Sequence, residues 1–192
     1  IEEYVNFKVD NKDELYIMSI EYFPQFTTFV AIRANTYSYL KEKVGENKKY
    51  QTYYKYCEEE WELCECLEGI SGDLQTEYKA MKAKYDDEQF EELQAEHASK
   101  IFTACKSAMK KFKETGTYKE LSNPYLNVYI RERLTKEEII RVFCELNGED
   151  DKEEYEDFLD FLTYVHITME DEAEEEYGEE WVLLYDERFP ES

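Results

Sequence analysis

The sequence predicts a mainly helical α+β domain that contains a small antiparallel sheet. Long stretches place an apolar residue at every third or fourth position, which is the spacing of one helix face. The N-terminal part instead holds short β-branched and aromatic segments separated by turn-forming residues. Aromatic residues make up 16% of the 192 residues, a content that disordered acidic chains lack. We therefore expect one folded domain over residues 1–192, and a division into residues 1–120 and an acidic helical lobe at residues 121–192 stays open.

A β-hairpin is predicted at the N-terminus. Tyr4–Val9 alternates between apolar and polar residues, Asp10–Asp13 has the composition of a turn, and Leu15–Ile20 is apolar and β-branched. The apolar run Trp181–Tyr185, close to the C-terminus, is a candidate for a further strand of the same sheet.

Helices are expected to fill most of the remaining chain. In the first 120 residues, apolar and aromatic residues at helical spacing predict helices at Phe26–Val44, Lys48–Leu67, Asp73–Tyr85 and Phe90–Phe112. Glycines separate the predicted helices. Gly45 and Gly116 follow two of them, and Gly69–Gly72 is expected to form a break between two others.

The last third of the chain has the most specific helix signals. Thr135 and Glu138 match the T-x-x-E capping box that begins a helix, and Asn147–Gly148 provides its end. A further helix is expected over Lys152–Ile167, and a short strand over Leu126–Ile130.

The net charge of −24 is distributed very unevenly along the chain. Residues 1–99 hold 22 acidic and 11 basic residues, whereas residues 100–141 hold five acidic and ten basic residues. Residues 145–192 hold 20 acidic residues against Lys152 and Arg188, so three quarters of the net charge lies in the last quarter of the chain. Such a field repels nucleic acid and attracts basic partners.

The densest part of this charge suggests an imitation of nucleic acid. Glu170–Glu180 carries eight carboxylates in 11 residues. In a helix this is one charge per roughly 2 Å, since the rise is about 1.5 Å per residue. Duplex DNA carries one charge per about 1.7 Å of its axis. The alternative is a solvated tail that aids solubility, but the apolar run Trp181–Tyr185 that follows needs a core or a partner to cover it.

One helical face is basic instead. Lys106, Lys110 and Lys113 lie opposite the apolar stripe of Phe90–Phe112. We expect this face to pair with the chain's own acidic segments rather than with nucleic acid, because the whole chain repels phosphate.

Motifs for catalysis, cofactors and metals are missing from the sequence. The five cysteines have no framework or zinc spacing, which fits a reducing cytoplasm, and the two histidines read as helix-face residues. No apolar run approaches the roughly 18 residues of a membrane span. No phosphate-binding glycine loop and no nucleophile elbow is present, so we expect no enzyme, cofactor or metal site.

The segment Leu134–Phe161 resembles a calcium-binding EF-hand in outline, as a helix, an acidic loop with Asn147–Gly148 and a second helix. The resemblance covers fewer than 30 residues. It departs from the EF-hand pattern because Gly148 precedes the acidic residues and the apolar Leu146 takes the place of the first ligand.

Charge and size together favour an interaction protein. In composition the chain looks like the acidic DNA-mimic antagonists of phages and mobile elements, such as anti-restriction and anti-CRISPR proteins. That resemblance implies competition for a basic, nucleic-acid-binding surface of a partner, expected to be a nuclease, in the cytoplasm of the host cell. The expected partner-binding residues are Glu149, Asp150, Asp151, Glu153, Glu154, Glu156, Asp157, Asp160, Glu170, Asp171, Glu172, Glu174, Glu175, Glu176, Glu179, Glu180 and Trp181. Two alternatives remain, a cytoplasmic immunity protein that neutralises one toxin and an adaptor or scaffold protein.

Overall fold

Strand β1, with the sequence LYIMSIEYF, is the centre of the sheet and is buried along nearly its whole length. The computed structural model describes residues 1–9, 12–23, 29–45, 51–58, 61–130 and 134–169. In chain order the elements are α1 (Glu2–Lys8), the 3₁₀ turn η1 (Lys12–Glu14), β1 (Leu15–Phe23), β2 (Phe29–Thr36), α2 (Tyr37–Val44), α3 (Gln51–Tyr56), β3 (Leu63–Cys66), α4 (Glu68–Lys84), α5 (Asp87–Lys113), α6 (Gly116–Lys119), β4 (Tyr125–Ile130), α7 (Lys136–Asn147) and α8 (Lys152–Met169).

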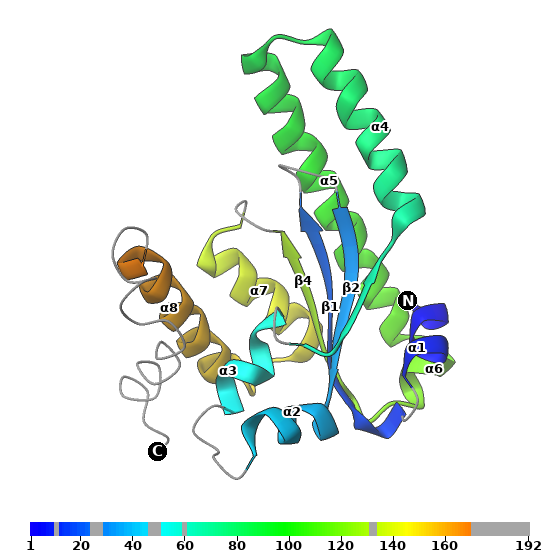
Figure 1. The fold of residues 1–192 in the computed structure, drawn as a ribbon, viewed down its shortest axis with the longest axis vertical. Helices are drawn as coiled ribbons and strands as arrows, with labels where there is room; N and C mark the ends of the chain where they lie inside the picture. The colour runs from blue at the N-terminus through cyan, green and yellow to red at the C-terminus, as the bar shows by residue number, and fades with distance from the viewer. Residues whose placement is uncertain (10–11, 24–28, 46–50, 59–60, 131–133, 170–192) are drawn as a thin grey trace.

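The predicted α+β class is confirmed, with helices around one small sheet (Figure 1). The strand order is β3-β2-β1-β4. β1 and β2 form an antiparallel hairpin and β3 pairs antiparallel with β2, but β4 runs parallel to β1. The sheet is therefore mixed rather than antiparallel. The reason is the long connection through α5 and α6, which returns the chain to the same end of the sheet before β4 begins.

Two helix predictions were wrong where the chain forms strands of the sheet. Residues of β2 lie within the expected helix Phe26–Val44, and β3 lies within the expected helix Lys48–Leu67. Val30, Ala31 and Ile32 are all buried, so apolar side chains follow each other without the alternation that marks a strand with one exposed face. Helix α2 begins only where the Thr36 side chain accepts a hydrogen bond from the Tyr39 backbone.

The first hairpin strand was misplaced. Tyr4–Val9 was expected to be a strand, but Glu2–Lys8 forms helix α1, in which the neighbouring residues Tyr4 and Val5 are both buried. The expected break at Gly69–Gly72 is wrong too, because α4 runs through both glycines, where a Cβ atom would meet no neighbour.

The remaining helix predictions and the predicted short strand Leu126–Ile130 are confirmed. α5 carries the expected apolar stripe, β4 includes Leu126–Ile130, and Thr135 and Glu138 form a reciprocal capping box at α7. α7 ends at Gly148, whose φ of 104° is a conformation that favours glycine. The predicted strand Trp181–Tyr185 lies outside the described residues.

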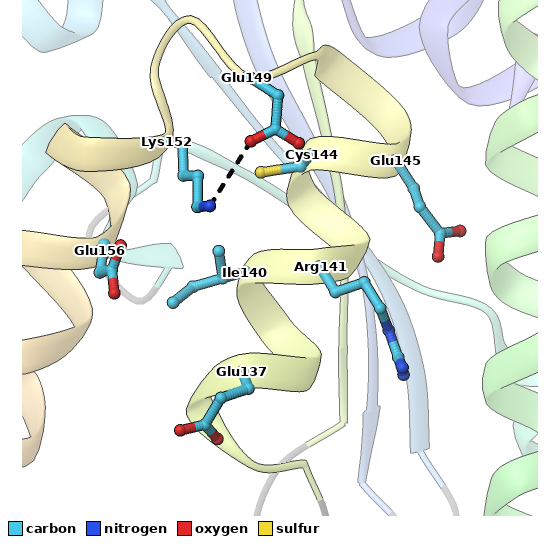
Figure 2. Close-up of a pocket in the computed structure, with 8 residues that line it drawn as sticks. All are labelled: Glu137, Ile140, Arg141, Cys144, Glu145, Glu149, Lys152 and Glu156. Atoms are coloured by element: carbon cyan, nitrogen blue, oxygen red, sulfur yellow. Dashed lines mark ion pairs between the residues drawn. The ribbon is translucent and has the colours of Figure 1, made fainter.

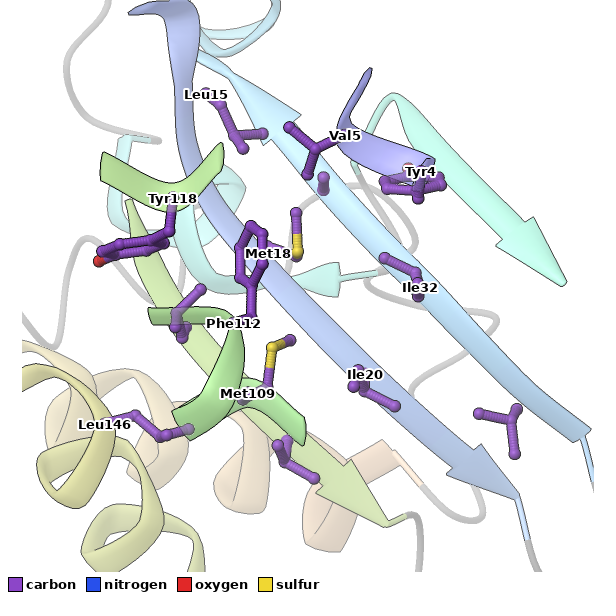
Figure 3. Close-up of a cluster of buried hydrophobic side chains, with 14 of the residues drawn as sticks. Tyr4, Val5, Leu15, Met18, Ile20, Ile32, Met109, Phe112, Tyr118 and Leu146 are labelled. Carbon is purple, nitrogen blue, oxygen red and sulfur yellow. The ribbon is translucent and has the colours of Figure 1, made fainter. Parts of the chain in front are cut away.

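The two faces of the sheet support separate cores. On one face, α1, α5 and α6 cover an apolar cluster that includes Met18, Ile32, Met109 and Phe112 (Figure 3). On the other face, α2, α3, α8 and part of α7 cover a more aromatic cluster around Phe143. α4 and the first half of α5 project from the body as a helical hairpin (Figure 1). In the described part of the chain, no helix is both long and apolar enough to cross a membrane.

Candidate functional site

Eight of the 17 predicted contact residues are brought together by the loop after α7 and by the first half of α8. These residues are Glu149, Asp150, Asp151, Glu153, Glu154, Glu156, Asp157 and Asp160. The other nine lie outside the described residues, namely Glu170, Asp171, Glu172, Glu174, Glu175, Glu176, Glu179, Glu180 and Trp181. We name the described group, residues 149–160, the α8 acidic face.

Several carboxylates of the α8 acidic face are fixed by contacts with the body of the protein. Asp151 accepts a hydrogen bond from the Tyr125 hydroxyl at 2.6 Å, and Glu154 accepts one from the Lys55 ammonium at 3.0 Å. Lys136 pairs with Asp160. Within the loop itself, Glu149 pairs with Lys152 at 3.6 Å. These bonds give the carboxylates defined positions.

Three of the predicted residues are exposed to solvent. They are Glu149, Asp150 and Glu153. Asp157 is partly buried, and burial, together with the negative charge of Glu153 and Asp160, raises the pKa of its carboxyl group. Burial is the main cause of this shift, and the neighbouring carboxylates add to it.

The Lys55 ammonium contacts two aromatic rings and pairs with Glu154 in the first turn of α8. Its ammonium lies 4.8 Å from the ring centre of Tyr56 and 5.2 Å from that of Tyr125, while it bonds to both oxygens of Glu154. Burial is the main cause that raises the pKa of Tyr56 and of Tyr125, and Glu154 adds to both shifts. Both hydroxyls therefore stay protonated near neutral pH. The exposed ring of Tyr37 packs at a tilt against the ring of Tyr16, which also lies on the α3 and α8 side of the sheet.

A hollow of about 460 Å³ lies between α7 and α8 (Figure 2). Its lining consists of Glu137, Ile140, Arg141, Cys144, Glu145, Glu149, Lys152 and Glu156. Hydrogen bonds from Lys110 and Lys106 lower the pKa of Glu145. Burial and the neighbouring Glu149 raise the pKa of the Cys144 thiol, which is therefore a poor nucleophile at neutral pH.

The basic face of α5 pairs internally, as predicted. Lys106 and Lys110 both form ion pairs with Glu145 of α7, at 3.1 and 3.0 Å. Lys113 donates to the backbone oxygen of Leu146. This face is therefore used to attach α7 to α5.

Sequence reasoning missed a polar row on the α3 and α8 side of the sheet. Ser19 of β1 lies directly opposite Arg33 of β2 and beside Asn127 of β4 in the strand register. Arg33 donates to the fully buried Glu21 at 2.5 Å and to the backbone oxygen of Glu58 at 3.1 Å. We name these residues, Ser19, Glu21, Arg33 and Asn127, the buried polar row.

The buried polar row is bonded to α8. The Asn127 amide donates to the Tyr155 hydroxyl at 3.0 Å and to the Glu58 carboxylate at 3.2 Å. Burial raises the pKa of Tyr155 well above its usual range, and the charge of Glu58 adds to this shift. A charged or amide residue inside each of three apolar segments, LYIMSIEYF, FVAIRANT and YLNVYI, was the sequence signal for this row.

The described residues do not favour a metal site. Among them, no group of three or more His, Cys, Asp and Glu side chains is arranged to hold a metal ion. The loop between α7 and α8 runs from Gly148 to Asp151, which is too short for the 12-residue loop of an EF-hand. The EF-hand resemblance is therefore limited to the outline.

One comparison with known proteins gives a match. Residues 2–148 match a family model described as Domain of unknown function (DUF4303). The comparisons with curated proteins and with solved structures gave no match. The matched segment ends immediately before the α8 acidic face and includes the buried polar row. Because this segment covers well over half of the chain, the protein belongs to the DUF4303 family.

Proposed function

We propose that the chain is a non-enzymatic inhibitor that blocks a basic, nucleic-acid-binding surface of a partner protein, with a cytoplasmic nuclease as the expected class. The mechanism is competition. Carboxylates of the α8 acidic face and of Glu170–Glu180 occupy the positions that phosphates take on the partner.

The fixed carboxylates of the α8 acidic face are the observation that supports this proposal. Tyr125, Lys55 and Lys136 hold three of them in place, while Asp150 and Glu153 face solvent. Charges that are positioned before binding lose little conformational entropy when the partner arrives. The arrangement therefore suits recognition of a basic surface better than a freely moving acidic tail does.

Two parts of the chain have different roles in the proposed mechanism. Residues 149–192 follow the matched segment and hold 19 acidic and two basic residues. Residues 2–148 supply the sheet, most of the two cores and the cations that hold α8. In this proposal the family domain is the support, and the acidic region that follows it makes the contact.

A specific immunity protein would use the same electrostatics. It differs by binding one toxin tightly and leaving other nucleic-acid-binding proteins alone. An adaptor protein would instead rely on apolar contacts, so its complexes would survive high salt.

The proposal is tested by affinity capture with the full chain as bait in a lysate of the cells that contain it. We expect capture of a basic nucleic-acid-binding protein at low salt, with release by high salt or by added duplex DNA. The charge-reversed variant Asp150→Lys with Glu153→Lys should lose this partner. Glu88→Lys with Glu92→Lys is the matched control, because it reverses two exposed carboxylates on α5 and should retain the partner.

A second variant examines the acidic run outside the described residues. Reversal of Glu174, Glu175 and Glu176 to Lys should abolish inhibition of the captured partner while the circular dichroism spectrum stays unchanged. Full inhibition by this triple variant would remove Glu170–Glu180 from the contact. Capture of a partner that resists both salt and DNA would reject competition for a nucleic-acid site altogether.

A further inference from the structure

Strand β3 forms one edge of the sheet, on the opposite side of the molecule from α8 (Figure 1). Its four residues, Leu63–Cys66, pair with β2 on one side, and no strand in the described part of the chain pairs with the other side. Cys64 is exposed, so this edge is open to solvent. An open edge presents backbone groups that can pair with an added strand.

The register identifies the backbone groups that face outward. The Leu67 N–H donates to the Val30 oxygen at 2.9 Å, and Glu65 lies opposite Ile32. Hydrogen-bonded and non-hydrogen-bonded pairs alternate along an antiparallel ladder. The N–H and C=O groups of Glu65 therefore point to β2, whereas those of Cys64 and Cys66 point away from it.

A hollow of about 480 Å³ lies beside this edge, between α1 and the sheet. It is lined by Ile1, Glu3, Tyr4, Lys8, Ile32, Glu65 and Leu67. The Glu65 side chain lies on this face of the sheet. In a strand that pairs with β3, every second residue would also direct its side chain to this face.

The Tyr4 hydroxyl supplies an independent sign of a ligand. Tyr4 is 7% exposed, and its hydroxyl has no hydrogen-bond partner in the part of the chain that the structure describes. Burial is the main cause that raises the pKa of this group, and the nearby Cys64 and Glu65 contribute. A buried hydroxyl without a partner is unfavourable, so a donor that reaches the Tyr4 hydroxyl would be stabilised by the new hydrogen bond.

We infer that the β3 edge binds an extended segment of a partner protein, which adds as a strand and places a Lys or Arg side chain in the hollow. Ile32 and Leu67 would contact the aliphatic part of that side chain. Its cationic end would lie near Glu3 and Glu65, in place of the Lys8 ammonium that pairs with Glu65 at 2.9 Å, and would donate to the Tyr4 hydroxyl.

Charge favours this occupant over a second copy of the chain. Two copies, each with a net charge of −24, repel one another, whereas a basic segment is attracted. The short length of β3 also limits unselective pairing at the edge. This site is separate from the α8 acidic face, so either proposal can fail without the other.

The test uses nine-residue peptides of alternating Thr and Val, with Lys, Arg, Leu or Glu at the central position, added to the ¹⁵N-labelled full chain. We expect the Lys and Arg peptides to shift the amide signals of Tyr4 and of residues 63–67, with a Kd of about 1 mM or tighter. Cys64→Pro removes an outward N–H and should weaken binding about tenfold or more, whereas Cys64→Ala keeps that N–H and should bind normally. Tyr4→Phe should weaken the Lys peptide more than the Leu peptide.

Other results would overturn the inference. Shifts confined to α7 and α8, equal binding of the Glu peptide, or normal binding by Cys64→Pro each exclude strand addition with a basic side chain. Dimerisation that Cys64→Pro abolishes, measured by light scattering, would make a second copy the occupant. If Cys64→Pro fails to fold, hydrogen exchange of the wild-type chain decides, because added Lys peptide must slow exchange at Cys64 and Cys66.

Discussion

On the side of α1, α5 and α6 the sheet presents Met18, Ile20 and Ile32, whereas on the side of α3 and α8 it presents the buried polar row. The first side excludes water from an apolar core and holds the α5 helix. The second side combines aromatic packing with directional bonds, several of which end on α8 or on the loop before it. The difference indicates that one face stabilises the domain while the other sets the position of its acidic helix.

The largest effect is expected from a truncation on the apolar side. Phe112 is 2% exposed and packs edge-on against Tyr118, with ring centres 5.5 Å apart. Phe112→Ala should lower the free energy of unfolding by about 4 kcal/mol, measured by urea denaturation. Phe90→Ala, on the projecting hairpin, is a matched truncation of a half-buried ring and should cost about 1–2 kcal/mol. Equal losses would contradict the assignment of the main core to this face.

A somewhat smaller effect is expected when the buried ion pair is broken. Arg33→Met leaves the fully buried Glu21 without its guanidinium and should cost about 3 kcal/mol in the free energy of unfolding. Adding Glu21→Leu to this variant should recover most of the loss, because two apolar side chains then replace the ion pair. A double-mutant cycle in urea measures this coupling, and purely additive losses would show that the pair is not coupled.

A local effect is expected where Asn127 of the sheet donates a hydrogen bond to Tyr155 of α8. Asn127→Leu removes the donors to Tyr155 and Glu58 and should cost about 2 kcal/mol. Tyr155→Phe removes one acceptor and should cost about 1 kcal/mol. Hydrogen exchange should accelerate in α8 more than in α5 for both variants. Uniform acceleration in the two helices would contradict the role of Asn127 in holding α8.

The smallest effect concerns pH. Glu145 has a lowered pKa because Lys110 and Lys106 bond to it, so it contributes stability that is lost as the pH falls through that lowered value. Asp157 has the opposite sign. Its raised pKa favours the protonated form in the folded state, so its unfavourable contribution at neutral pH disappears as the pH falls through the raised value. Side-chain NMR titration of the folded chain and of the chain in urea checks both directions, and a folded-state Asp157 pKa at or below its value in urea would contradict the effect of burial and of the neighbouring carboxylates on this group.

Local signals in the sequence were enough for some elements and not for others. The capping box at Thr135, the stop at Gly148 and the stripe of α5 depend on nearby residues, and all three are confirmed. The strands β2 and β3 depend on pairing with distant segments and are buried on both faces or very short, so their apolar spacing resembled a helix.

The site was predicted only in part for the same reason. Charge density along the chain pointed to residues 149–160, which α8 does bring together. The partners that hold them, Lys55, Tyr125 and Lys136, come from three other elements or loops, and no local pattern links them to α8. The buried polar row was visible as polar residues inside apolar strands, but its connection to α8 through Asn127 required the fold.

Contact between the α8 acidic face and a basic partner is the basis of the proposed inhibition. The direct measurement is the Kd of the purified complex with the captured partner at several salt concentrations, for the wild type and both double charge reversals. We expect Asp150→Lys with Glu153→Lys to weaken binding strongly and flatten the salt dependence, while Glu88→Lys with Glu92→Lys keeps the wild-type slope. Equal slopes and affinities for the two double variants would show that overall charge, and not the α8 acidic face, governs the interaction.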